Sequence, residues 1–292
     1  MQQLYFFLLF FFFYAFIGWC AEVAFAAWKS RRFVNRGFLN GPVCPIYGLG
    51  VSLAVQLLSP YQSSIPLLFV ASVILCTALE WFTGFLLEKL FHSKWWDYSH
   101  LPLNLNGYVC LPFSLLWGVA CVLIVKIIHP LVYQMLALIP VPLGVVLLVI
   151  FCAVLAADLA VTASSILKLN RQLEKLEEIT AEPHQISDHI GESIYERTTA
   201  AIEKQEELKE TFAAHRTEAM ETVENVSETM ESVSAEMRER IAGLREKSRQ
   251  LAENLPPVQL RLLRAFPRME NQRHRQALED LRKRLKQLEK RR

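Results

Sequence analysis

The chain has 292 residues, of which 52% are hydrophobic and 21% charged, and its formal net charge is only +2. The charges are unevenly spread, because 12 of the 60 charged residues precede Lys168. This division excludes a single water-soluble globular domain and indicates apolar segments of membrane-spanning length followed by a soluble, helix-forming tail. We therefore expect a transmembrane helical domain at residues 1–170 and a charged helical or coiled-coil tail at 171–292.

The apolar runs are candidate membrane spans, at residues 4–28, 43–58, 66–91, 109–128 and 143–167. The second run is short and contains Pro45 and Gly48, which is typical of a broken or re-entrant segment. The proline-punctuated segment 129–142 is expected to form an interfacial turn or half-helix. The predicted fold class is all-α: a polytopic membrane helix bundle of about five spans, with a long-helix tail.

Basic residues mark one side of this bundle. They follow the first and third runs, as Lys29, Arg31, Arg32, Arg36, Lys89 and Lys94, and they are abundant in the tail. The connections 59–65 and 129–142 carry no Lys or Arg. By the positive-inside rule, we expect a multi-pass protein of the cell membrane with its N-terminus outside and its tail in the cytoplasm.

Ionisable side chains also occur within the apolar runs, where they are costly unless they face a polar interior. Glu80 and Glu88 are just over two helical turns apart, so both can lie on one face, and Gly84 between them would let another helix approach. Arg36 is a candidate partner for one of these two carboxylates. The candidate substrate-binding residues are Glu22, Asn35, Arg36, Asn40, Tyr47, Glu80, Glu88, Trp96, Asp97, Tyr98, Asn104 and Asn106.

Several of these residues also have a structural interpretation. Glu22 and Glu80 could form structural ion pairs, and Glu88 could be an interfacial charge near a helix end. Trp96 and Tyr98 fit an aromatic belt. Residues 104–107 could form an Asn-Gly turn. The spacing identifies no catalytic nucleophile with an adjacent base, and we expect no metal and no cofactor.

The tail carries a heptad pattern. Val223, Met230, Met237, Leu244 and Leu251 recur every seven residues, which predicts a coiled coil over 223–251. Pro183 is expected to bound this helix at its start, and Pro256 with Pro257 to end it.

A long helix of this kind needs a partner. The partner would be a second copy in a homodimer, or the final segment 271–292 of the same chain, which has its own leucine stripe. The basic end from Arg261 onward favours either the acidic stretch 174–236 or anionic lipid headgroups, and no motif indicates nucleic-acid binding.

Three stretches carry a family resemblance. They are G-W-C-A-E at 18–22, N-R-G-F-L-N-G-P-V-C-P-I-Y-G at 35–48, and W-D-Y-S at 96–99 followed by N-L-N-G at 104–107. Together they resemble the ABC-transporter type IV (CmpB-like) permease family of bacterial membrane proteins. The resemblance covers residues 6–171, and the stretch 262–267 also looks like a family element.

The resemblance implies a transporter permease acting on a small solute or ion through a polar site in the cytoplasmic half of the bundle. The chain contains no G-x-x-x-x-G-K-[ST] loop, so ATP hydrolysis would require a separate ATPase subunit. Two alternatives remain open: a membrane-embedded enzyme acting on a lipid or lipid-linked substrate, and a membrane scaffold that works through its coiled-coil tail. Of these readings, a non-enzymatic role is the one we expect.

Overall fold

The computed structural model describes residues 2–209, 239, 242–244 and 246–291. It is 77% helix and 4% strand, so the predicted mostly helical class is confirmed. The chain forms two compact units. The membrane unit comprises Met1–Asn170 and Pro256–Arg275, and the tail unit comprises Arg171–Leu255 and Gln276–Arg292. That residue 170 is a boundary between two independent domains stays a prediction.

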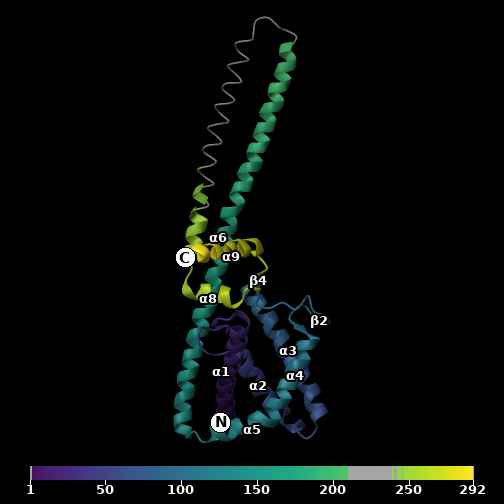
Figure 1. The fold of residues 1–292 in the computed structure, drawn as a ribbon, viewed down its shortest axis with the longest axis vertical. Helices are drawn as coiled ribbons and strands as arrows, with labels where there is room; N and C mark the ends of the chain where they lie inside the picture. The colour runs from purple at the N-terminus through teal and green to yellow at the C-terminus, as the bar shows by residue number, and fades with distance from the viewer. Residues whose placement is uncertain (1, 210–238, 240–241, 245, 292) are drawn as a thin grey trace. The chain divides into compact units, whose positions relative to one another are not determined.

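Four helical stretches of the described chain are long and apolar enough to cross a membrane. The first is α1 (Gln2–Ser30) and the second is α3 (Ile65–Phe91). The third joins α4 (Leu111–Leu123), the π-helical turn η2 (Ile124–Ile128) and α5 (His129–Ala137). The fourth is Val141–Ile179, the beginning of α6 (Val141–Lys209) (Figure 1).

The second predicted span is too short to cross the apolar core of a bilayer. Helix α2 (Pro45–Leu58) has 14 residues and is therefore about 21 Å long, less than the ~30 Å apolar core of a bilayer. It begins beside the middle of α1, because the backbone N–H of Cys44 donates to the carbonyl of Ala15 at 3.0 Å. Gly48 then lies directly against the backbone of Phe11. The chain thus returns along α1 first as the extended α1–α2 loop (residues 31–44) and then as a helix.

The segment 129–142, expected to form an interfacial turn or half-helix, contains the nine-residue helix α5, which follows α4 through the π-helical turn η2. Pro130 has no N–H to donate, and a proline normally interrupts a helix for that reason. Here the preceding turn is π-helical, and the N–H of His129 bonds to the carbonyl of Ile124. This wider turn accommodates the proline without ending the helix.

Short strands join the ends of the helices. Strand β1 (Ser93–Lys94) pairs antiparallel with β4 (Glu270–Asn271), and β2 (Asn104–Leu105) pairs antiparallel with β3 (Val109–Cys110). A single 3-10 turn, η1 (Ser59–Tyr61), connects α2 to α3. Helix α8 (Pro257–Ala265) precedes β4 in the membrane unit.

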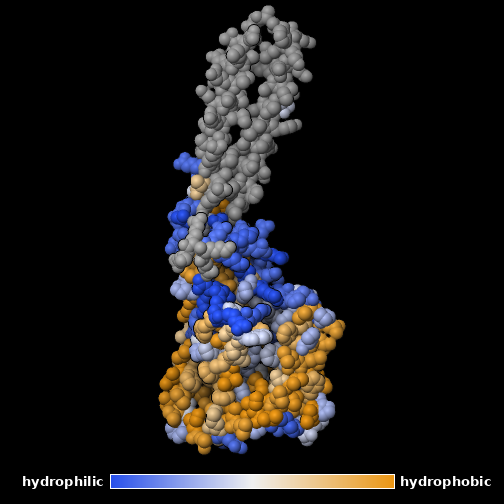
Figure 2. All heavy atoms as spheres, in the orientation of Figure 1, coloured by the Kyte–Doolittle hydropathy of each residue, from blue (hydrophilic) through white to orange (hydrophobic). Residues whose placement is uncertain are grey.

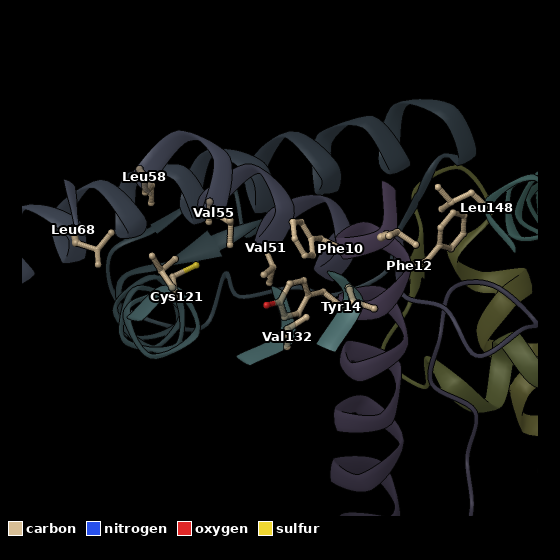
Figure 3. Packing of buried hydrophobic residues seen from close by; sticks show 14 residues of the cluster. Phe10, Phe12, Tyr14, Val51, Val55, Leu58, Leu68, Cys121, Val132 and Leu148 are labelled. Carbon is tan, nitrogen blue, oxygen red and sulfur yellow. The ribbon is translucent and has the colours of Figure 1, made fainter. Parts of the chain in front are cut away.

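The core of the membrane unit is apolar and lies where α1, α2, α3 and the α4–α5 helix meet. Phe10 and Tyr14 of α1 pack there with Val55 of α2, Leu68 of α3 and Cys121 of α4 (Figure 3). Hydrophobic side chains also cover much of the outer surface of these helices (Figure 2). A continuous apolar surface of this extent is not stable in water, so the chain is a membrane protein.

One end of the membrane unit, here called the loop end, gathers the α1–α2 loop, residues 92–110 and residues 256–275. The pairing of β1 with β4 and a 2.7 Å hydrogen bond from Arg261 to the carbonyl of Gly37 join these segments. The basic residues that follow α1 and α3 are all at this end. At the opposite end Lys126 donates to the carbonyl of Gln62, at 3.0 Å. The predicted orientation, with the loop end in the cytoplasm, stays a prediction.

In the tail unit, α6 continues to Lys209 without a break, so the expected helix start at Pro183 is wrong. One proline removes a single backbone hydrogen bond, and a long helix can pass over that loss with a bend. The helical residues 246–253 end before Pro256, and Pro257 begins α8, as predicted.

The tail unit buries apolar residues of several helices. Leu173 of α6, Ala252 and Leu255 are buried, and so are Leu278 and Leu281 of α9 (Arg275–Arg291). Val223, Met230 and Met237 of the predicted coiled coil lie outside the described residues, so the coiled coil and the homodimer through it stay predictions.

Candidate functional site

Glu22 of α1 and Tyr47 of α2 contact each other where α2 begins. The hydroxyl of Tyr47 donates to Oε1 of Glu22 at 2.6 Å, and Nε of Arg36 lies 3.5 Å from Oε2 of the same carboxylate. A Cβ atom at Gly18 would collide with the side chain of Tyr47, so the glycine admits this tyrosine. The guanidinium of Arg36 also lies over the ring of Phe25, with 5.4 Å to its centroid.

The partner of Arg36 differs from the sequence prediction. The sequence suggested Glu80 or Glu88 as the carboxylate that Arg36 contacts, but the structure pairs it with Glu22. The reason is the α1–α2 loop, which folds back against α1 and carries Arg36 toward the helix that precedes it.

Glu80 lies within reach of the same group. The charges of Glu80 and Glu22 both act on the hydroxyls of Tyr47 and Tyr98, so these four side chains lie near one another. Burial and the nearby Glu80 carboxylate raise the pKa of Tyr98 above its usual range, and Glu22 contributes in the same direction. The Tyr98 hydroxyl therefore stays protonated near both carboxylates. We call Glu22, Arg36, Tyr47, Glu80 and Tyr98 the carboxylate site.

Polar atoms of α3 beside this site lack partners. Oε2 of Glu80 is buried and has no hydrogen-bond partner among the described residues, and the same holds for Nε1 of Trp81 and Oγ1 of Thr77. Buried polar atoms are nearly always hydrogen-bonded, because leaving one unpaired costs about 1–3 kcal/mol, and more if it is charged. A bound group that satisfied Oε2 of Glu80 would remove that cost.

Asn35 and Asn40 shape the α1–α2 loop. Oδ1 of Asn35 accepts from Nε1 of Trp19 at 2.8 Å and from the N–H of Gly37 at 3.1 Å. The amide nitrogen of the Asn35 side chain donates to the carbonyl of Asn40 at 2.8 Å. Their role in this structure is therefore to hold the loop.

Asp158 of α6 fixes the same loop from one side. Its carboxylate accepts the backbone N–H groups of Asn40 at 3.0 Å and Gly41 at 2.7 Å, and it accepts the Asn40 side-chain amide at 2.9 Å. Thr162, one turn further along α6, also donates to this carboxylate. Asp158 is not among the twelve candidate residues identified from the sequence.

Arg261 of α8 holds the loop from the other side, and the sequence prediction missed it. Its guanidinium donates to the carbonyls of Gly37 at 2.7 Å and Phe38 at 3.1 Å, and to Oδ1 of Asn40 at 3.1 Å. Burial lowers the pKa of Arg261, and the charge of Asp158 opposes that shift. An arginine keeps its charge in proteins, so these are charge-assisted bonds. The one available signal was that Arg261 directly precedes the family-like stretch 262–267.

The residues after α3 form a compact turn. Asn104 caps it, because its amide donates to the carbonyl of Leu101 at 2.8 Å and its Oδ1 accepts the N–H of Gly107 at 3.2 Å. Asn106 has a positive φ of 56°, a conformation that Asn tolerates better than most residues. Nε1 of Trp96 donates to the carbonyl of Tyr108 at 2.8 Å. Asn104, Asn106 and Trp96 thus position Tyr98 within this turn.

Asp97 stabilises the beginning of the same turn. Its carboxylate accepts the backbone N–H of Ser99 at 3.2 Å and the Ser99 hydroxyl, and it lies 3.8 Å from Nζ of Lys94. Burial by itself would raise the pKa of Asp97. The two hydrogen bonds from Ser99 and the charge of Lys94 lower the pKa by more than burial raises it, so the net shift is downward.

Glu88 lies apart from the carboxylate site and anchors residues that follow α8. The side-chain amide of Gln272 donates to Oε1 of Glu88, and Tyr108 lies near the same carboxylate. The ring of Tyr108 packs on Gly84, so the expected close approach at this glycine is made by an aromatic ring and not by another helix.

The structure therefore brings together five of the twelve candidate residues, and the other seven shape the loops around them. Substrate binding by any of them stays a prediction. Among known protein families, the model of the family described as "Putative ABC-transporter type IV" matches residues 9–163, more than half of the chain. No curated protein and no solved structure matches the chain.

Proposed function

This chain belongs to that transporter-type family, and from this premise we propose that it is a membrane permease subunit whose carboxylate site binds a small cation or a protonated amine. The observation that carries the proposal is the buried, unpaired Oε2 of Glu80 beside a second carboxylate. Charges inside a membrane protein typically pair or mark the path of an ion or solute.

The charges of the site favour a cation as the occupant. Glu22 and Glu80 can carry two negative charges, whereas Arg36 supplies one positive charge and contacts Glu22. When Glu80 is ionised, one negative charge is therefore left over, on the carboxylate that also has an unpaired oxygen. A small cation would neutralise it and coordinate Oε2, and the tyrosine hydroxyls would supply further oxygen ligands.

The site is also open enough to exchange an ion. The side chain of Glu22 is 26% exposed and that of Arg36 is 37% exposed, while the unpaired oxygen of Glu80 is buried. We infer an entry from the loop end, past Arg36, toward Glu80. With the predicted orientation this entry would face the cytoplasm, where a separate ATPase subunit would also have access to the loop end.

Binding can be measured without knowing the energy source. The purified full chain in lipid nanodiscs would be titrated with sodium, potassium or methylammonium chloride, with choline chloride keeping the ionic strength constant. Tryptophan fluorescence is the readout, because Trp81 adjoins Glu80 and stacks on Phe85 with 5.4 Å between ring centroids. We expect a saturable change with at least one cation.

Glu80→Gln should abolish that response, because the amide keeps the shape of the side chain but removes its charge. Glu253→Gln is the matched control, since Glu253 pairs with Arg249 in the tail unit and should leave cation binding unchanged. A wild-type chain with no saturable response, or a Glu80→Gln chain that responds like the wild type, would overturn the proposal. The lipid-enzyme and scaffold hypotheses stay predictions.

A further inference from the structure

Residues 256–275, here called the anchor segment, belong to the membrane unit although both of their ends join the tail unit. Leu255, the last tail residue before the segment, precedes Pro256, and Gln276 follows Arg275. The tail therefore does not simply follow the membrane unit. The membrane unit is instead built from two stretches of the chain, and the second stretch, of 20 residues, interrupts the tail unit in sequence.

The anchor segment is attached to the membrane unit along its length. The side-chain amide of Gln259 donates to the carbonyl of Ser165 at 3.1 Å, and that of Asn271 donates to Oδ1 of Asn170 at 3.0 Å. The N–H of Gln272 donates to the carbonyl of His92 at 2.9 Å. Gln259 and Asn271 are each only 1% exposed, so these contacts are buried.

Within this segment, Arg261 makes the contacts closest to the carboxylate site. Its guanidinium bonds to the carbonyls of Asn35 and Gly37, the residues on either side of Arg36. Asp158 accepts N–H groups of the same loop at Asn40 and Gly41. The loop is thus held by a cation on its carbonyls and an anion on its amides.

Aromatic side chains also link the anchor segment to the α1–α2 loop. The ring of Trp95 lies 5.0 Å from the ring of Phe38 in the α1–α2 loop, and 5.0 Å from the ring of Phe266 in the anchor segment. Trp95, the middle ring of the three, is 5% exposed, and Phe38 and Phe266 are half-buried. A displacement of the anchor segment would therefore disturb the loop at Phe38 as well as at Gly37.

We propose that Arg261 is a positioning residue that couples the tail to the carboxylate site: it fixes the α1–α2 loop so that Arg36 stays against Glu22. The part of this proposal that concerns cation affinity rests on the proposed function. When the anchor segment is seated, the backbone on both sides of Arg36 is fixed. When a change in the tail unit unseats it, Arg36 loses its fixed place and the cation affinity of the site changes. By linkage, cation binding must then alter the seating of the anchor segment by the same factor.

The structural half of the proposal is tested by hydrogen exchange, in cation-free buffer, on the full chain in nanodiscs. In Arg261→Gln we expect the amides of Asn40 and Gly41 to exchange about tenfold faster or more, because the loop loses several charge-assisted bonds. Arg268→Gln is the matched control, since Arg268 is an exposed arginine of the same segment. Arg261→Lys should fall between these two, because lysine keeps the charge but cannot make the same set of bonds.

The functional half is tested by the cation titration described above. Arg261→Gln should change the dissociation constant about tenfold and leave the amplitude at saturation unchanged, with partial rescue by Arg261→Lys. Wild-type exchange at Asn40 and Gly41 in Arg261→Gln would overturn the positioning role even if cations bind. Faster exchange in Arg261→Gln, together with a wild type that binds no cation, would instead support the positioning role and overturn the proposed function. Faster exchange with an unchanged dissociation constant would overturn the coupling. Gel filtration and circular dichroism would establish that each variant is folded, and if Arg261→Gln is not, Arg261→Lys decides both outcomes.

Discussion

The hydroxyl of Tyr47 donates a 2.6 Å hydrogen bond to Oε1 of Glu22, and this bond joins the start of α2 to the C-terminal half of α1. It satisfies a carboxylate that would otherwise have only Arg36 as a partner on that side. Glu22 and Tyr47, which belong to separate motifs of the sequence, are thus direct partners in the structure.

Tyr47→Phe removes the donor and keeps the ring, which packs at 5.5 Å from the ring of Trp117. We expect the free energy of unfolding to fall by about 1–2 kcal/mol, because Glu22 loses a hydrogen bond to its charged form. Denaturant titration in detergent micelles measures the change. Tyr61→Phe, at an exposed tyrosine, is the control and should have no measurable effect. Equal stability of Tyr47→Phe and the wild type would contradict the bond.

Gly48→Ala should destabilise the protein, because the added Cβ atom would collide with the carbonyl oxygen of Phe11 on α1. A backbone atom cannot move aside cheaply, so we expect a loss of about 1–3 kcal/mol. Gly50→Ala is the matched control two residues along the same helix, where the nearest atom, of Leu79, would be 3.9 Å away. Its stability should stay within about 1 kcal/mol of the wild type. A loss in Gly50→Ala as large as that in Gly48→Ala would argue against the α1–α2 contact.

The thiols of Cys76 on α3 and Cys121 on α4 can be joined by oxidation, because their sulfur atoms lie 3.5 Å apart. Treatment with copper phenanthroline should form one disulfide, with both thiol protons released and two electrons passing to the oxidant. Peptide mass spectrometry would identify the Cys76–Cys121 peptide. Cys76→Ser should abolish that product. A dominant disulfide involving the exposed Cys152 would be inconsistent with the packing of α3 on α4.

The turn at Asp97 should lose stability in acid. Its pKa is lowered in the folded chain by Ser99 and Lys94, against the effect of burial, so the ionised form stabilises the fold. That contribution is present above the ordinary aspartate pKa of about 3.9 and is lost as the pH falls through the lower folded value. We expect the thermal midpoint of the wild type to exceed that of Asp97→Asn near pH 6, and the gap to close below about pH 4. A gap that did not vary with pH would exclude this ionisation as its source.

Much of the architecture could be predicted from the sequence because it depends on local composition. Apolar runs of membrane length predicted the spans, although the second run forms the short helix α2 and is not among the four candidate spans of the described chain. Pro183 was misinterpreted, because a proline does not always end a helix. A proline removes one backbone bond, and whether the helix continues depends on what compensates for it, which at Pro130 is a π-helical turn.

The site was less predictable because it depends on partners far apart in the chain. Glu22, Glu80 and Arg36 were identified as unusual by their position in or beside apolar sequence, but that position does not say which residue meets which. Asn35 and Asn40 are polar residues of a family-like motif, so the sequence alone does not distinguish a binding role from a structural one. Only their contacts with Trp19, Asp158 and Arg261 show that they hold the loop.

The sequence by itself determined that this is a helical membrane protein, which family it belongs to, and on which helices the carboxylates lie, because hydropathy and motif spacing are local properties of the chain. Only the tertiary structure decided that Arg36 pairs with Glu22 and that Arg261, 221 residues away from Asn40, holds the α1–α2 loop. Such pairings depend on how α1, α6 and α8 pack, and packing brings together side chains whose proximity no local pattern records.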